Sequence, residues 1–214
     1  MHQFLTILIL IVLCIISVYV ILPKDECVVL RKIDTEDGVI EVVNPSCKEG
    51  LPHTTGPNTI RMTEAALHDP RAASTLVHER VHLDQKRNRS SWYEFYKTAW
   101  EYTLMSTPPP GLPYKYQYDL RPNPDTSDAP WAIWRSRYLF FPNYGPQRTL
   151  KEAVVQVYDL KERKLVEPPS EWRSAFCSGM LCPHQFEHPH ELAAEYIALQ
   201  MKTPASAKLF TWIH

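Results

Sequence analysis

The sequence predicts an α+β fold: one domain in which a small mixed sheet packs on helices that carry a His-Glu motif, preceded by one transmembrane helix. Three observations lead to this prediction. The chain opens with a long uncharged apolar run, short strand-like segments follow it, and two well-marked helices lie far apart in the remainder. The 214 residues suffice for one domain and an accessory segment. We therefore expect a transmembrane or signal-anchor segment at 1–23 and a single domain at 24–214.

The apolar run extends from Phe4 to Leu22, carries no charge, and stops at Pro23-Lys24. Its length is about what a helix needs to span a bilayer. A cleaved signal peptide is the alternative. An uncleaved anchor is favoured because the run is longer than a usual signal-peptide core, no Lys or Arg precedes it, and no A-x-A-like cleavage site follows it.

The orientation of the domain relative to the membrane is ambiguous in the sequence. Positive charge follows the span and none precedes it, which by positive-inside counting keeps the domain cytoplasmic. The cysteines indicate the opposite, because the four outside the span form two local pairs suited to disulfides, and such bonds are typical of oxidising compartments. These pairs are Cys27 with Cys47 and Cys177 with Cys182, and a glycosylation sequon begins at Asn88. We expect a single-pass membrane protein whose domain is lumenal or extracellular.

The first elements after the span are strands. Residues Cys27–Leu30 and Val39–Val43 are rich in β-branched residues, and Asp34–Gly38 between them has the composition of a turn. The following stretch to Asn58 is typical of a loop. Thr59–Thr63 then alternates in polarity and predicts a short strand.

A helix is predicted from Asp69-Pro70 to about Arg87. Asp suits the N-cap position, Pro suits the first helical position, and no Pro or Gly interrupts the helix before Arg87. Its apolar residues recur at helical spacing and form one stripe; they are Ala73, Leu76, Val77 and Val81.

A second helix is predicted at about Ser91–Met105. It is crowded with aromatic side chains, which we expect to be core rather than part of a cofactor site. Residues 107–146 are rich in proline and aromatics, and we interpret them as an ordered insertion rather than a flexible linker. Within it, Tyr138–Phe141 suits a strand.

The last third of the chain contains three more predicted elements. A short helix is expected near Leu150 and a strand at Val154–Leu160. A final helix begins at Pro189 and is stopped by Pro204. Its Ala193 and Ala194 are small and would allow close packing on the earlier helix.

The motif H-E-x-x-H consists of His78, Glu79 and His82. Two histidines four residues apart share one face of a helix, so both imidazoles can reach a single Zn²⁺. A catalytic zinc needs a third protein ligand, and Glu191 on the final helix is the favoured candidate. Glu195 lies four residues further on and shares that face. Like charges at this spacing repel, and a zinc ion on Glu191, with Glu195 accepting the N–H of a ligating histidine, would relieve the repulsion.

Other interpretations of these residues remain open. Glu191 can instead be a first-turn acid that is stabilised by the helix dipole. Three histidines are rival third ligands: His184, His188 and His190.

The two motifs together resemble the zincin metallopeptidases, and among these the gluzincins, as represented by thermolysin. The resemblance implies that His78, His82 and Glu191 bind zinc, that Glu79 is the catalytic base, and that Glu195 supports a ligand histidine. It also implies that the Thr59–Thr63 strand is the edge strand along which a peptide substrate lies. The chain departs from thermolysin in the much longer separation of His82 from Glu191 and in having Glu, not Asp, as the supporting acid. The further H-x-x-G-x-x-H pattern of metzincins is absent.

The function expected from these residues is that of a membrane-anchored zinc-dependent metallopeptidase. It would hydrolyse peptide bonds of a protein or peptide substrate through a zinc-activated water, with Glu79 as general base. The formal net charge of −1 does not suggest a nucleic-acid partner. The alternatives are a zinc-stabilised, membrane-tethered binding module without peptidase activity, and a helix that binds no metal. Candidates for stabilising the oxyanion are Arg137, Tyr138, His184 and Tyr196.

Overall fold

The computed structural model describes residues 27–149 and 153–214. These form an α+β fold, which confirms the predicted class. Within the two described ranges no helix is both long and apolar enough to cross a membrane. This corrects the predicted fold, because the described residues contain no membrane-spanning helix. The segment for which the span was predicted, 1–23, lies outside the described residues. The short helix expected near Leu150 also lies outside the described residues, at 150–152.

The first sheet is a small mixed sheet of four strands, as predicted. Its strands are β1 (Val29–Thr35), β2 (Gly38–Val43), β3 (His53–Thr55) and β4 (Thr59–Thr63), in the order β1-β2-β4-β3. Strand β2 pairs parallel with β4, and the other two pairings are antiparallel. The predicted Thr59–Thr63 strand has the expected bounds, but it lies inside the sheet. The edge strands are β1 and β3, and β3 lies in a stretch that we predicted to be a loop.

A second sheet was not predicted. It has five antiparallel strands in sequential order: β5 (Tyr102–Met105), β6 (Trp131–Trp134), β7 (Tyr138–Asn143), β8 (Val154–Asp159) and β9 (Lys164–Val166). The strands expected at Tyr138–Phe141 and Val154–Leu160 are β7 and β8. The proline-rich stretch 107–146 contributes α5 (Tyr114–Tyr118), β6 and β7, so it builds this sheet.

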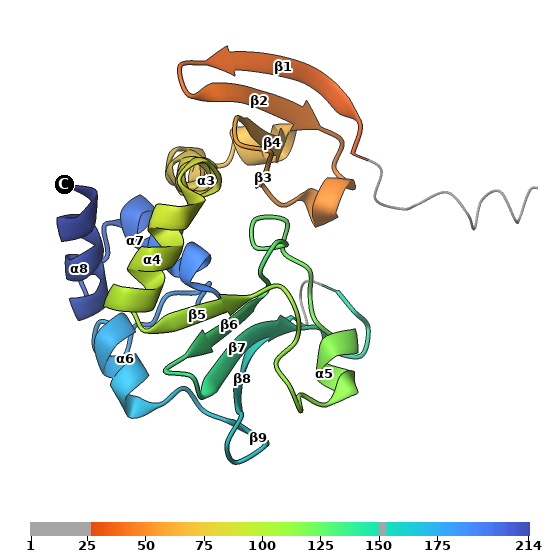
Figure 1. Cartoon of the computed structure of the whole chain (residues 1–214). Helices are drawn as coiled ribbons and strands as arrows, with labels where there is room; N and C mark the ends of the chain where they lie inside the picture. Colours follow the sequence, from red (N-terminus) through yellow and green to blue (C-terminus); the bar gives the residue numbers. More distant parts are fainter. Residues whose placement is uncertain (1–26, 150–152) are drawn as a thin grey trace, which may run out of the picture.

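The helices lie between and beside the sheets (Figure 1). They are η1 (Cys47–Gly50), α2 (Glu64–Leu67), α3 (Ala72–Arg87), α4 (Arg89–Ala99), α6 (Ser170–Phe176), α7 (Pro189–Leu199) and α8 (Pro204–Ile213). The motif helix α3 packs against α7 and against β3 and β4. Ala193 and Ala194 of α7 are fully buried, in agreement with the predicted close packing.

Three helix boundaries differ from the predictions. Helix α3 begins at Ala72, because the Asp69 carboxylate accepts the Arg71 backbone N–H in a turn instead of capping the helix. Helix α4 ends at Ala99, since Glu101 has a positive φ of 61° and the chain continues as β5. Helix α8 was not predicted. We expected Pro204 to end the preceding helix, but α7 ends at Leu199, and Pro204 occupies the first position of α8 after the N-cap residue Thr203.

The aromatic side chains of α4 form the main core, as predicted. Trp92, Phe95 and Tyr96 are buried and pack with residues of α6, α7 and α8. Both expected disulfides are present, joining Cys27 to Cys47 and Cys177 to Cys182. The first joins η1 to the segment that precedes β1, and the second closes a loop between α6 and α7. Residues next to both cross-links border the cleft described next.

Candidate metal centre

The two motif histidines meet on the buried face of α3. Their Nε2 atoms lie 3.0 Å apart and their rings cross at 78°. His82 is 1% exposed, and the side chain of His78 is 13% exposed. Both imidazoles therefore present a nitrogen to the same point.

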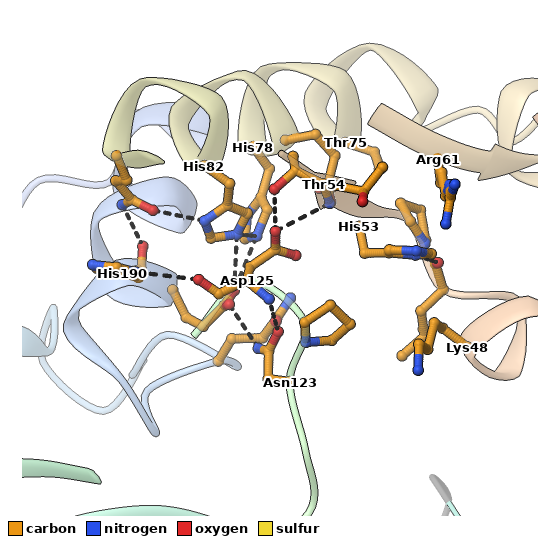
Figure 2. A pocket seen from close by; sticks show the side chains of 18 of the residues that line it. Lys48, His53, Thr54, Arg61, Thr75, His78, His82, Asn123, Asp125 and His190 are labelled. Carbon is orange, nitrogen blue, oxygen red and sulfur yellow. Dashed lines mark hydrogen bonds and ion pairs between the residues drawn. The ribbon is translucent and has the colours of Figure 1, made fainter. Parts of the chain in front are cut away.

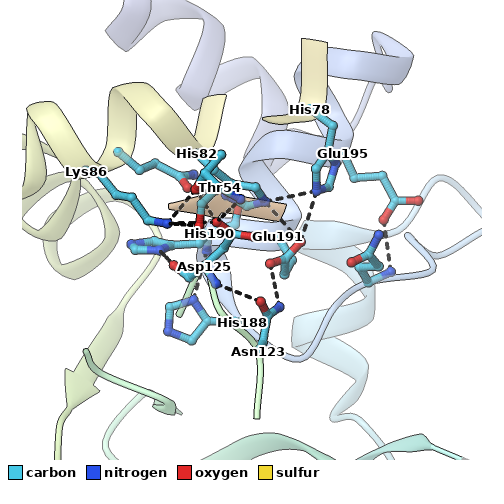
Figure 3. Close-up of polar contacts among 12 residues, drawn as sticks. Thr54, His78, His82, Lys86, Asn123, Asp125, His188, His190, Glu191 and Glu195 are labelled. Atoms are coloured by element: carbon cyan, nitrogen blue, oxygen red, sulfur yellow. Dashed lines mark hydrogen bonds and ion pairs between the residues drawn. The ribbon is translucent and has the colours of Figure 1, made fainter. Parts of the chain in front are cut away.

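Glu191 completes a group of three. It lies in the first turn of α7, and its Oε2 is 3.1 Å from His78 Nε2 and 3.4 Å from His82 Nε2 (Figure 3). Ligand atoms of a tetrahedral zinc lie about 3.3 Å from one another when each bond is about 2.0 to 2.1 Å long. The three separations are therefore those of three corners of such a tetrahedron, and two imidazoles with one carboxylate are a donor set that zinc accepts.

The His82 ring is oriented by Gln85, which the sequence analysis did not single out. Gln85 Oε1 is 2.7 Å from His82 Nδ1, and Gln85 Nε2 donates to Tyr96 Oη and to the His190 carbonyl oxygen. Because the amide nitrogen has two acceptors, the amide oxygen must face the ring. His82 Nδ1 is then the donor, and Nε2 is the ring nitrogen that faces His78 and Glu191. The available signal was position alone, since Gln85 follows His82 by three residues on the helix face.

Asn123 holds the other side of Glu191 and was also missed. Its Nδ2 donates to Glu191 Oε1 at 2.8 Å, which leaves Oε2 to face the histidines. Asn123 lies in the proline-rich stretch, remote in sequence from both motifs. No local pattern could have placed it here.

Glu195 has a different role from the predicted one. Its Oε1 accepts the His184 backbone N–H at 3.0 Å and its Oε2 accepts that of Gln185 at 2.9 Å. It therefore fastens the segment after the second disulfide to α7. The hydrogen bond to a ligand histidine that we expected from Glu195 is made by Gln85 instead.

Glu79 is buried beside the group of three. It is 4% exposed, and within the described chain its Oε2 has no hydrogen-bond partner. Burial raises the pKa of Glu79 to about 8, against the opposing charge of His82. The Glu79 carboxyl group is therefore desolvated and has one oxygen without a fixed partner, as expected for a residue that exchanges a proton with a bound molecule.

Charge within the group is concentrated on Glu191 and His82. Burial alone would lower the pKa of His82, but the Glu191 carboxylate raises it to about 10. Burial likewise opposes ionisation of Glu191, yet His82 and His78 hold the pKa of Glu191 well below its usual value. Glu191 and His82 are thus a buried ion pair, and a metal ion that binds His82 would take the place of its proton as the cation beside Glu191.

The rival histidines lie outside the group of three, although within the described residues the buried Nε2 of His190 has no hydrogen-bond partner. His188 Nε2 donates to the Ala129 carbonyl oxygen, and its Nδ1 accepts the His190 backbone N–H. His190 Nδ1 lies 3.4 Å from the Asp125 carbonyl oxygen. His184 is exposed and contacts Glu195 through its backbone. In the described part of the chain, two groups of potential ligand atoms converge. One is His78, His82 and Glu191; in the other, the cysteines near His53 are joined in a disulfide.

The group of three faces a cleft of about 1470 Å³ (Figure 2). The walls of the cleft are η1 and β3 on one side, α3 and α7 at the base, and residues 121–128 opposite.

Of the four oxyanion candidates, His184 lines the cleft. Arg137 is paired with Asp159, and Tyr196 donates to the Phe176 carbonyl oxygen. Tyr138 lies in β7 and is not part of the cleft wall.

Comparisons of the chain with protein-family models, with curated proteins and with solved structures gave no match. The resemblance to gluzincins therefore depends on the two motifs and on the geometry described above. Function has to be argued from the site itself.

Proposed function

We propose that this protein is a zinc-dependent peptidase of the gluzincin type, with His78, His82 and Glu191 as the zinc ligands and Glu79 as the general base. One observation carries the proposal. Three ligand atoms converge at tetrahedral spacing on an open cleft, and the buried, unpaired oxygen of Glu79 lies in the same cleft.

The chemistry divides between the metal and the protein. Zinc supplies Lewis acidity towards a carbonyl oxygen and lowers the pKa of water. Glu79 would take the proton of the attacking water and deliver it to the leaving amine. Gln85 and Asn123 hold His82 and Glu191 so that their lone pairs face one point. His184 lines the cleft and is the remaining candidate for stabilising the oxyanion.

A purely structural zinc site is the weaker alternative. Structural sites are usually closed by four protein ligands. The described residues offer three converging ligand atoms, those of His78, His82 and Glu191. Both ring nitrogens of His188 are hydrogen-bonded, and the unpaired Nε2 of His190 does not belong to the converging group. A binding module without peptidase activity would also not require a buried, unpaired Glu79.

The two disulfides indicate the kind of compartment in which the protein acts. Such bonds persist in oxidising compartments and are rare in reducing ones. We propose that the protein acts in an oxidising compartment, with an unfolded or extended protein segment as its substrate.

Zinc analysis together with hydrolysis tests the proposal. The purified chain should contain one zinc per molecule and should cleave fluorescein-labelled casein. Removal of zinc with 1,10-phenanthroline should abolish cleavage, and added zinc should restore it. A protein that binds no zinc, or that binds zinc and leaves casein and mixed peptides intact, would overturn the peptidase proposal.

A further inference from the structure

Residues 121–128 form an irregular segment that reaches into the cleft; we call it the cleft segment. It follows α5 and precedes β6, and it belongs to neither sheet. Backbone hydrogen bonds hold its two ends: Arg121 N–H donates to the Pro142 carbonyl oxygen and Ala129 N–H to that of Thr126. Between them the segment is held in the cleft by side-chain contacts (Figures 2 and 3).

The cleft segment covers the free edge of β3. Thr54 is the residue of β3 whose backbone groups point away from β4, since its neighbours His53 and Thr55 alternate with it in the ladder. Thr54 N–H donates to Asp125 Oδ1 at 3.0 Å, and the Thr54 carbonyl oxygen accepts from Lys86 Nζ at 3.0 Å. Both outward backbone groups of this edge are therefore occupied by side chains of the same protein.

The contact is strong and partly buried. Asp125 is 6% exposed, its Oδ1 also accepts from the Thr54 hydroxyl, and Lys86 Nζ lies 2.9 Å from it. Hydrogen bonds to a charged group are about twice as strong as neutral ones. Two residues earlier, Asn123 contacts the candidate zinc ligand Glu191. One short segment thus touches both the edge strand and the metal group.

We propose that Asp125 of the cleft segment is an intramolecular competitor for the edge of β3, and that a substrate must displace Asp125 from Thr54, while Asn123 stays on Glu191, before it is cleaved. This inference deepens the proposed peptidase function and rests on it. A peptide that adds to a sheet edge needs free backbone N–H and C=O groups on that edge. Here Asp125 supplies the acceptor that a substrate carbonyl would otherwise supply, and Lys86 supplies the donor. Displacement breaks no sheet pairing, because the segment is not part of a strand.

Binding without hydrolysis gives a direct test. The background is the zinc-loaded full chain with Glu79→Gln, and the probe is reduced, carboxymethylated casein labelled with fluorescein. Adding Asp125→Ala removes both hydrogen bonds to Thr54, and we expect casein to bind about three to ten times more tightly. A second variant, Pro122→Gly with Pro124→Gly, loosens the segment without touching these contacts and should act in the same direction.

Matched controls keep the outcomes separate. Pro108→Gly with Pro110→Gly changes two exposed prolines outside the cleft wall and should leave casein binding unchanged. If the Glu79→Gln protein binds casein and both cleft-segment variants bind it equally or less tightly, the competitor role is wrong while the peptidase proposal stands. If no variant binds casein, both proposals fail.

Discussion

The Nδ1 atom of His82 donates a 2.7 Å hydrogen bond to Gln85 Oε1, three residues further along the same helix. The bond is fully buried, and the Gln85 amide nitrogen is fixed in turn by Tyr96 and by the His190 backbone. Helix α3 therefore carries both a proposed metal ligand, His82, and the group that sets its tautomer. Helix α7 contributes to the same arrangement through the His190 carbonyl oxygen, so the packing of the two helices orients the imidazole.

Substituting Gln85→Ala should weaken zinc binding about tenfold to a hundredfold, because the His82 ring loses the partner that fixes its tautomer and orientation. The measurement is zinc affinity in competition with a chromogenic chelator. Gln117→Ala, on α5 and outside the cleft wall, is the matched control and should bind zinc as the wild type does. Unchanged zinc affinity in the Gln85 variant would show that His82 does not depend on this bond.

Substituting Glu79→Gln should leave the zinc content intact and lower the rate of casein hydrolysis by at least about a hundredfold. The amide has nearly the shape of the carboxyl group but cannot accept the proton of the attacking water. Glu94→Gln, an exposed change on α4, controls for loss of a carboxylate elsewhere. Turnover retained in the Glu79 variant is incompatible with its role as general base.

Substituting Glu191→Ala should remove zinc from the dialysed protein, since only His78 and His82 would remain as ligands of the group. The affinity loss should exceed that of the Gln85 variant, because a ligand itself is removed. Metal analysis after dialysis gives the result. If this variant kept its full zinc content, Glu191 would not be the third ligand. A histidine at the start of α7, His190 or His188, would then be the candidate.

Local signals were sufficient for the parts of the site that lie within one helix. The spacing of His78 and His82 fixes their common face, and Pro189 marks the helix that carries Glu191, so each of these was predictable from a few adjacent residues. That Glu191 reaches the histidines depends on how α7 packs on α3. The small residues Ala193 and Ala194 indicated close packing of these helices and nothing more specific.

The missed features depend on contacts between distant segments. Asn123 and Asp125 enter the cleft because the chain between α5 and β6 extends from the second sheet to α7 and β3 before it returns as β6. No periodic pattern in the sequence predicts that path. Strand β3 has only three residues and is defined by its pairing with β4, not by its composition. Pro204 was taken for a stop although it starts α8, because proline suits the end of one helix and the first position of the next equally well.

Stability should depend on pH through Asp159, which lies at the end of β8 and is 2% exposed. The hydrogen bond from Arg137 lowers the pKa of Asp159, and backbone N–H groups of Lys161 and Glu162 add to this. A carboxyl group with a lowered pKa stabilises the fold above its unfolded pKa of about 4, and this contribution is lost as the pH falls through the folded value. Asp159→Asn should therefore lower the free energy of unfolding at pH 7, and the difference from the wild type should shrink below about pH 4.

Urea denaturation at pH 7, 5 and 3 measures this difference. Asp119→Asn is the control, since the ion pair of Asp119 with Arg148 is exposed and should contribute little to stability. A difference between Asp159→Asn and wild type that is the same at pH 3 and pH 7 would mean that packing, and not the charge of the carboxylate, accounts for the stabilisation.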